Sequence, residues 1–137
     1  MTNTLPPLAL VTGAACGIGK AIAERLTDQG FEVVINDRDG EAAQATASAI
    51  GSARAAVLDL LDGAAAAHAA SERPVAALVN NVRIFDERSI FELSSADFRR
   101  MYDVNVVALF ALSQAIAAHA AWRQDRQYRL ARLPRRA

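Results

Sequence analysis

The sequence has few of the residues that build disulfide frameworks, metal centres or nucleic-acid surfaces. It holds one cysteine, Cys16, which excludes an internal disulfide and a zinc site made of several cysteines. Its two histidines, His68 and His119, have no second ligand residue at the sequence spacing of a metal-binding motif, so no metal site is predicted. The 15 basic and 15 acidic residues cancel, and this balance argues against nucleic acid or a membrane surface as a partner.

Long apolar runs and a leader pattern are also missing. We find no stretch that approaches an uncharged apolar segment of about 20 residues, and residues 1–10 lack the basic start and apolar block of a signal peptide. We therefore expect a soluble cytoplasmic protein. Its 137 residues suit one domain. The apolar fraction of 53% includes 31 alanines, which bury little surface each, so the predicted core is thin.

Charge is distributed unevenly along the chain. Residues 1–121 carry 9 basic and 14 acidic residues, whereas residues 122–137 carry 6 arginines and a single acid, Asp125. This contrast predicts a folded body over residues 1–121 and an arginine-rich tail over residues 122–137. The tail contains no lysine and no known motif for nucleic-acid binding, so it does not indicate such a partner.

Short apolar runs alternate with helical patterns through the first eighty residues, which predicts an α/β fold with a parallel sheet. The strands are predicted at Leu8–Thr12, Phe31–Asn36, Ala53–Leu58 and Val75–Val79, and the helices at Ile18–Gln29, Glu41–Ile50 and Gly63–Ser71. Right-handed crossovers then give the strand order 3-2-1-4 of a Rossmann-like, doubly wound sheet.

A long helix is predicted over Ser94–His119, after a loop at Asn81–Leu93. Ser94 or Ser95 can cap it, and Asp97 lies in its first turn. One apolar face is expected along this helix. Its members are Phe98, Met101, Val104, Leu109, Leu112 and Ile116.

A glycine-rich turn joins the first predicted strand to the first predicted helix. It reads Thr12-Gly13-Ala14-Ala15-Cys16-Gly17-Ile18-Gly19, which matches the pattern T-G-x-x-x-G-x-G. Glycine allows a tight turn and close approach of a phosphate, and the helix N-terminus attracts the pyrophosphate of a dinucleotide. The alternative is an ordinary turn between strand and helix. The predicted cofactor contacts here are Thr12, Gly13, Ala15, Cys16, Gly17, Ile18 and Gly19.

With this turn the sequence resembles the short-chain dehydrogenase/reductase family, from about Leu8 to about Ala121. The resemblance implies an NAD(P)-dependent oxidoreductase that moves a hydride between nicotinamide and a small-molecule alcohol or carbonyl. It also implies homo-oligomers of full-length relatives, paired through long helices after the fourth strand. Asp37, twenty residues after Gly17, can accept hydrogen bonds from the adenosine ribose and would repel a 2′-phosphate, which favours NAD. Arg38 could accommodate that phosphate, so NADP stays open.

Two further segments match the family at the cofactor. Asp59-Leu60 corresponds to the pair that holds the adenine ring, although Asp59 is also a candidate helix cap. The segment Asn80-Asn81-Val82-Arg83 stands where the family has N-N-A-G. Asn80 and Asn81 are therefore expected to contribute to cofactor binding. Without the glycine we expect less close approach of the backbone to the cofactor, and we expect the Arg83 side chain to obstruct the site.

Asn105 matches a helix asparagine of the family, whose backbone helps to bind a water in the proton relay. The resemblance makes it the one candidate catalytic residue here. Asparagine is a poor residue for a helix interior, so the alternative is an exposed helical Asn.

The family's catalytic serine, tyrosine and lysine follow the long helix and find no match in this sequence. Tyr128 is rejected, because Arg132 stands where the lysine belongs and the two cations differ in geometry. Possible codons for residues 122–131, read one nucleotide later, give GGRIVNIAS, which resembles the family's next strand and catalytic serine. We therefore expect a truncation or frameshift after about residue 121, with a genuine basic extension as the alternative. The chain is expected to turn over little substrate. A non-catalytic nucleotide-binding module and a truncated product without function are the other possibilities.

Overall fold

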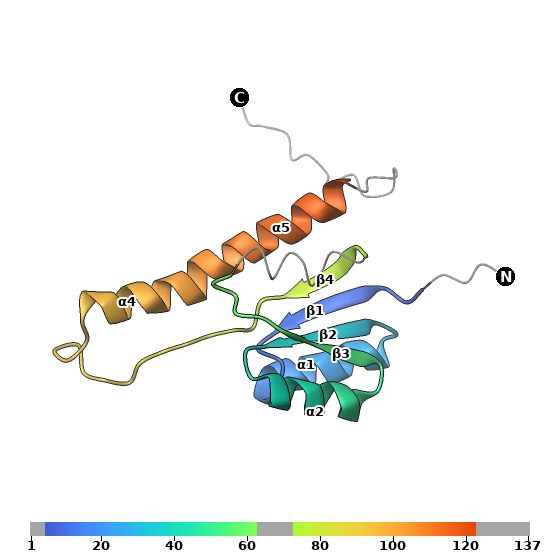
Figure 1. Cartoon of the computed structure of the whole chain (residues 1–137), viewed down its shortest axis with the longest axis horizontal. Coiled ribbons are helices and arrows are strands. Elements are labelled where there is room, and N and C mark those ends of the chain that lie inside the picture. Colours follow the sequence, from blue (N-terminus) through green and yellow to red (C-terminus); the bar gives the residue numbers. More distant parts are fainter. Residues whose placement is uncertain (1–4, 63–72, 123–137) are drawn as a thin grey trace.

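The computed structural model describes residues 5–62 and 73–122 (Figure 1). The predicted helix at Gly63–Ser71 and the tail residues 123–137 lie outside the described residues. The elements are β1 (Leu8–Thr12), α1 (Gly17–Asp28), β2 (Glu32–Asp37), α2 (Gly40–Ile50), β3 (Ala53–Val57), β4 (Val75–Val79), α4 (Ser95–Tyr102), the π-helical segment η1 (Asp103–Ala108) and α5 (Leu109–Trp122).

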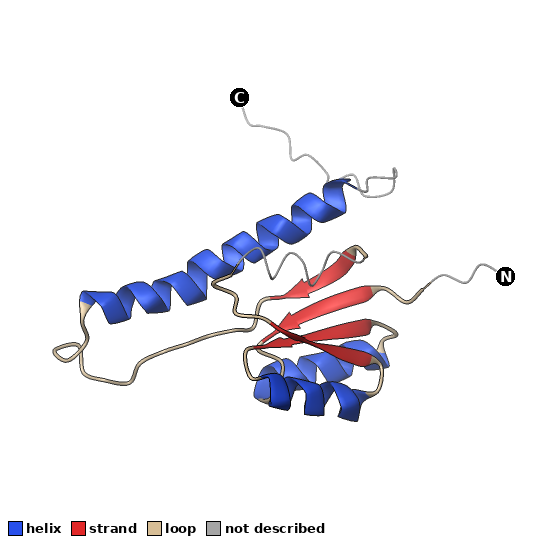
Figure 2. Cartoon of the chain, in the orientation of Figure 1, coloured by secondary structure: helices blue, strands red, loops and turns tan. Residues whose placement is uncertain are grey.

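The described strands form one parallel sheet in the order β3-β2-β1-β4, which confirms the predicted topology. Helices α1 and α2 cover one face, and α5 lies along the other, while α4 extends the long helix beyond the ends of the strands (Figure 2). The order reverses at β1, which pairs with β2 on one side and β4 on the other. In open α/β sheets of this kind, ligands bind outside the carboxyl ends of the strands at the point of reversal.

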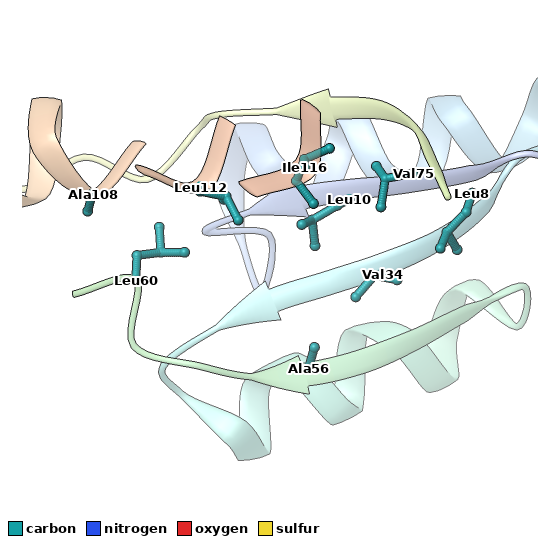
Figure 3. Packing of buried hydrophobic residues seen from close by; sticks show 9 residues of the cluster. All are labelled: Leu8, Leu10, Val34, Ala56, Leu60, Val75, Ala108, Leu112 and Ile116. Carbon is teal, nitrogen blue, oxygen red and sulfur yellow. The ribbon is translucent and has the colours of Figure 1, made fainter. Parts of the chain in front are cut away.

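Successive side chains of each strand point to opposite faces of the sheet, so the apolar residues of the strands form two layers, one on each face. On the α5 side, Leu10 and Val34 pack with Leu112 and Ile116 of the helix (Figure 3). On the other side the strands pack against alanines of α1 and α2, which are Ala23, Ala43 and Ala47. All five residues of β1 are buried, as expected of a central strand covered on both faces.

The predicted long helix is present, but it is not a uniform α-helix. Ser94 caps it in a reciprocal capping box with Asp97. The π-helical segment η1 then changes the helical phase between α4 and α5. Leu112 and Ile116 are buried as predicted, whereas Phe98 is 64% exposed. The prediction of a single continuous apolar face is therefore wrong for the first part of the helix.

The same helix corrects the expectation that no stretch approaches an apolar span. Over Ser95–His119 it is long and apolar enough to be a candidate membrane span by length and composition, with a mean hydropathy of 1.4 in its 18-residue window. Only 17% of that window is buried. The outward side carries exposed apolar residues, which are Phe98, Tyr102, Val106, Val107 and Phe110.

Candidate functional site

A cleft of about 770 Å³ lies at the carboxyl ends of the strands, where the chain leaves β1, β2, β3 and β4. Arg100 of α4 and Val104 of η1 contribute to its wall. Most of the sequence-predicted residues line this cleft: Gly13, Cys16, Gly17, Ile18, Asp37, Arg38, Asp59, Leu60 and Asn81. Thr12, Ala15, Gly19, Asn80 and Asn105 do not line it, and their contacts are internal to the scaffold.

The glycine turn has the backbone geometry that its spacing predicts. Gly13 and Gly17 have φ angles of 61° and 58°, in the left-handed region that favours glycine. A Cβ atom on Gly19 would lie 2.4 Å from the Gly13 carbonyl oxygen and 2.5 Å from Nδ2 of Asn81. A Cβ atom on Gly17 would meet no atom within 4 Å. Glycine at position 19 therefore allows close packing, whereas Gly17 leaves open space in the cleft.

Helix α1 presents its N-terminus to this cleft. Cys16 is the N-cap residue, but its side chain makes no capping hydrogen bond. The first turn contains no acidic residue that would neutralise the positive end of the helix dipole. Cys16, Gly17 and Ile18 all line the cleft, so this helix end suits a negatively charged group.

Two side chains connect the glycine turn to the end of β4. The Thr12 hydroxyl donates to the Val79 carbonyl oxygen at 3.2 Å, and its oxygen accepts from the backbone N–H groups of Asn81 at 2.9 Å and Val82 at 3.2 Å. In return, Nδ2 of Asn81 donates to the carbonyl oxygens of Thr12 at 3.1 Å and Gly13 at 3.0 Å. These bonds fix the relative position of the two loops on either side of the cleft.

Asn80 and Asn105 connect the same loop to the long helix. Nδ2 of Asn80 donates to the Ser113 hydroxyl oxygen at 2.9 Å. Asn105 holds the backbone of Ile84 by both polar groups: Oδ1 accepts from the Ile84 N–H at 2.9 Å, and Nδ2 donates to the Ile84 carbonyl oxygen at 2.7 Å. Asn105 lies in the π-helical segment, a geometry frequent at functional sites. The alternative of an exposed helical asparagine is therefore wrong, whereas the family's backbone role for this residue stays a prediction.

Asp37 lies at the end of β2 and connects it to the glycine turn. Its Oδ2 accepts from the Ala15 N–H at 3.2 Å, and its Oδ1 accepts from the Asp39 N–H at 3.1 Å. The Ala15 carbonyl oxygen accepts from the Thr46 hydroxyl at 2.7 Å. Both backbone polar groups of Ala15 are thus used within the protein. Thr46 was missed from the sequence, where a threonine inside an alanine-rich helix gave the only signal.

The turn after β3 contains a polar residue, Asp59, that shapes the turn and an apolar residue, Leu60, that packs into the core. Oδ1 of Asp59 accepts from the Leu61 N–H at 3.0 Å, which shapes the turn. The Leu60 side chain is buried in the core with Ala108 and Leu112 (Figure 3). Leu60 therefore joins the cleft to the core beneath the long helix.

Several cleft residues were not predicted as contributors from the sequence, among them Asn36, Arg100 and Val104. Asn36 is buried in β2, where its Nδ2 donates to the carbonyl oxygens of Ala56 and Leu58, while its Oδ1 has no partner among the described residues. Arg100 lines the cleft from α4. Val104 does so from η1, one residue before Asn105. The position of Asn36, a polar residue inside an apolar strand, was the one feature of the sequence from which its place in the cleft could have been predicted. No local feature of the sequence indicated that Arg100 lines the cleft.

Arg83, which replaces the family's glycine, lies along the wall of the cleft. Its guanidinium group is 4.9 Å from the centroid of the Phe85 ring, within cation–π range. This contact holds the guanidinium against the loop that follows β4.

Across residues 5–62 and 73–122, no group of three or more His, Cys, Asp or Glu side chains is placed to hold a metal ion.

A glycine turn, an open helix N-terminus and an acidic residue at the end of β2, all at the reversal point of a parallel sheet, define a dinucleotide-binding α/β protein. The family model for short chain dehydrogenases matches residues 7–127, and the chain belongs to this family.

Similar proteins agree with this family. A sorbitol dehydrogenase from Cereibacter sphaeroides is 38% identical over 115 residues, which cover 80% of this chain and 45% of the relative. A metagenomic short-chain oxidoreductase in complex with NADP is 31% identical, with a TM-score of 0.76 over 84% of this chain and 57% of that chain. A 3-ketoacyl-(acyl-carrier-protein) reductase from Brucella melitensis complexed with NADH is also 31% identical, with a TM-score of 0.75 over 85% of this chain and 51% of that chain. The chain spans about half the length of such relatives.

Proposed function

We propose that the chain forms the cofactor-binding part of an oxidoreductase with NAD as its preferred cofactor, acting on a small-molecule alcohol or carbonyl. The observation that carries the proposal is the cleft, in which the open end of α1 and the Asp37 carboxylate lie on one continuous wall. Gly17 leaves open space in the cleft beside the end of α1, and Oδ1 of Asn36, which has no partner among the described residues, adds a polar group to the wall.

Each part of the cleft has a distinct binding role in this proposal. The backbone N–H groups at Gly17 and Ile18 bind the pyrophosphate, because the end of α1 offers unpaired donors there. Asp37 accepts hydrogen bonds from the ribose hydroxyls, and Asp59 faces the adenine ring. The nicotinamide ring supplies or accepts the hydride.

A second candidate function is nucleotide binding without turnover. Among the described residues, no lysine lines the cleft, and Tyr102 is half-exposed on α4 rather than directed to it. Hydride transfer to a carbonyl also needs a proton donor at the oxygen. These 137 residues alone are therefore expected to bind NADH and to show little turnover.

The exposed side of the long helix supports a proposal about assembly. Phe98, Tyr102 and Phe110 are apolar and exposed on α4 and α5. Contiguous exposed apolar surface of this kind favours protein association. We expect full-length members of the family to form homo-oligomers through this helix, and we expect this chain to be cytoplasmic, without a membrane or nucleic-acid partner.

The test is a titration of the 137-residue chain with NADH, followed by the change in nicotinamide fluorescence. Asp37→Asn is expected to weaken NADH binding about tenfold, because a hydrogen bond to a charged acceptor is lost. Glu24→Gln removes one negative charge from the exposed side of α1 and is the matched control, with unchanged affinity. A folded chain that does not bind NADH would overturn the proposal, and substrate turnover by this chain would overturn the second candidate.

A further inference from the structure

Charge is distributed unevenly over the walls of the main cleft. Its two acidic residues, Asp37 and Asp59, lie at the ends of β2 and β3. The segment that follows β4 lines the cleft with residues 81–84, and Arg83 is the one charged residue of this segment. Because β1 lies between β2 and β4 in the sheet, the carboxylates and the Arg83 side chain lie on opposite sides of the glycine turn that follows β1.

The positive charge of Arg83 is not paired with a carboxylate in the described parts of the chain, where the cations of the ion pairs are Arg73 and Arg88. The Arg83 guanidinium group lies 4.9 Å from the centroid of the Phe85 ring instead. An aromatic ring holds a guanidinium group in place but does not neutralise its formal charge, and arginine stays protonated in proteins. Arg83 therefore keeps a full positive charge at the wall beside β4.

The other two arginines of the cleft have acidic neighbours. Arg38 and Arg100 also line a smaller cavity of about 220 Å³, and Asp86 and Asp97 contribute to the same wall. These two carboxylates outnumber Arg88, the cation that is paired with both of them, so they offset part of the positive charge of Arg38 and Arg100. Among the residues that line the β4 side of the main cleft, no carboxylate offers such compensation.

The order of the strands determines which half of a dinucleotide lies beside Arg83. In the proposed function the pyrophosphate binds at the end of α1, which follows β1, and the adenosine ribose binds at Asp37, at the end of β2. The strand order β3-β2-β1-β4 then leaves the side of β4 for the nicotinamide half. The nicotinamide ring is positively charged in NAD⁺ and neutral in NADH. Arg83 thus lies on the side where the two redox forms of the cofactor differ in charge.

We propose that Arg83 makes the cleft selective for the reduced cofactor, because its fixed positive charge repels the oxidised nicotinamide ring and does not repel the neutral reduced ring. This inference rests on the proposed function of the cleft and adds the redox form that the cleft selects. The adenosine and the pyrophosphate are the same in both forms, so their contacts cancel in the ratio of the two affinities. The reduced form is the one that donates a hydride to a carbonyl.

The experiment measures the dissociation constants of NADH and NAD⁺ for the 137-residue chain, the first by nicotinamide fluorescence and the second by displacement of NADH. NADH is expected to bind more tightly than NAD⁺. Arg83→Gln should lower this preference about three- to tenfold, because one repulsion between charges across a partly solvated cleft is lost. Arg83→Lys keeps the charge and should keep most of the preference. Arg99→Gln is the matched control, because Arg99 is exposed on α4 outside the cleft and should not affect the ratio.

Ionic strength gives a test that needs no variant. Raising the salt concentration from about 0.01 M to about 1 M shortens the Debye length from about 30 Å to about 3 Å, so the preference for NADH over NAD⁺ should shrink. ADP-ribose has the same pyrophosphate as NADH and lacks the nicotinamide ring. Its affinity relative to that of NADH should therefore stay nearly constant over the same range of salt and in Arg83→Gln.

The outcomes separate this inference from the proposed function. If both redox forms bind but their affinity ratio is the same in Arg83→Gln as in the original chain, the inference is wrong and the proposed function stands. The same holds if Arg83→Lys loses the preference as fully as Arg83→Gln, or if the preference does not respond to salt. If neither form binds the folded chain, the proposed function falls, and the inference about Arg83 falls with it.

Discussion

Asn105 is predicted to act through its side chain, as a clamp on the loop that forms the wall of the cleft. Its amide both accepts from and donates to the backbone of Ile84. Asn105→Ala removes two hydrogen bonds of about 0.5–1.5 kcal/mol each, so the free energy of unfolding is expected to fall by about 1–3 kcal/mol. The affinity for NADH should fall as well, because Ile84 lines the cleft.

Asn105→Asp gives a sharper test, because only one of the two bonds survives. The introduced carboxylate can still accept from the Ile84 N–H, but its other oxygen faces the Ile84 carbonyl oxygen, to which the amide donated at 2.7 Å. Protonation restores that donor, so the folded state raises the pKa of the introduced carboxyl above its unfolded value of about 3.9. Relative to the original protein, the variant is then most stable at about pH 4 and below and loses stability as pH rises through the raised pKa.

The assay is urea unfolding followed by circular dichroism at about pH 4 and about pH 8. Asn80→Asp is the matched control, because its partner is the Ser113 hydroxyl, which can rotate from its present acceptor, the Leu109 carbonyl oxygen, to donate to a carboxylate. Its effect should be small and independent of pH. The clamp is refuted if Asn105→Asp is as stable as the original protein at both pH values, or if both variants show the same dependence on pH.

Three other predictions test the scaffold around the cleft. Gly19→Ala places a Cβ atom 2.4 Å from a backbone oxygen, so it should cost about 1–3 kcal/mol of stability in urea unfolding and weaken NADH binding, whereas Gly51→Ala, far from the cleft, should leave NADH affinity unchanged. Thr12→Val removes one donor and one acceptor from buried bonds and should cost about 2–3 kcal/mol in the same assay, with most of the loss recovered in Thr12→Ser. Hydrogen bonds from Ser94 lower the pKa of Asp97 to about 2, so the stability that this carboxylate contributes is present above its unfolded pKa of about 3.9 and is lost as pH falls toward 2. Asp97→Asn should therefore flatten the unfolding profile between about pH 4 and pH 2, and an unchanged profile would contradict it.

The parts of the fold that were predictable from sequence depend on local patterns. The apolar run at Leu8–Thr12 and the glycine spacing after it fix a strand, a turn and a helix within a few residues of one another. Once four such runs alternate with helices, the handedness of the crossovers leaves few strand orders, and β3-β2-β1-β4 is the one observed. Asp37 was assigned to the cofactor by the family resemblance, and it lies at the cleft because the ends of parallel strands meet at one edge.

The parts that were not predictable depend on how distant segments meet. No residue of α4 is buried, so nothing packs over Phe98 and the periodicity that places Leu112 and Ile116 in the core has no packing surface there. Asn105 shows the same limitation: its sequence context gave its position on the helix but not its partner, the backbone of Ile84. Arg100 lies at the cleft only because α4 passes over the loop after β4, and no motif marks that crossing.

The predicted cofactor residues fall into two groups that affect binding by different physical routes. Gly17 and Asp37 line the cleft, so their substitution changes direct contacts with a ligand, and Asp37 in addition holds the backbone of Ala15 and Asp39. Thr12, Gly19 and Asn105 are directed into the scaffold, so their substitution acts on affinity by moving the loops. Stability and affinity measured on the same variants separate the two routes: scaffold variants should lower both quantities together, whereas Asp37→Asn should lower affinity by more than its effect on unfolding explains.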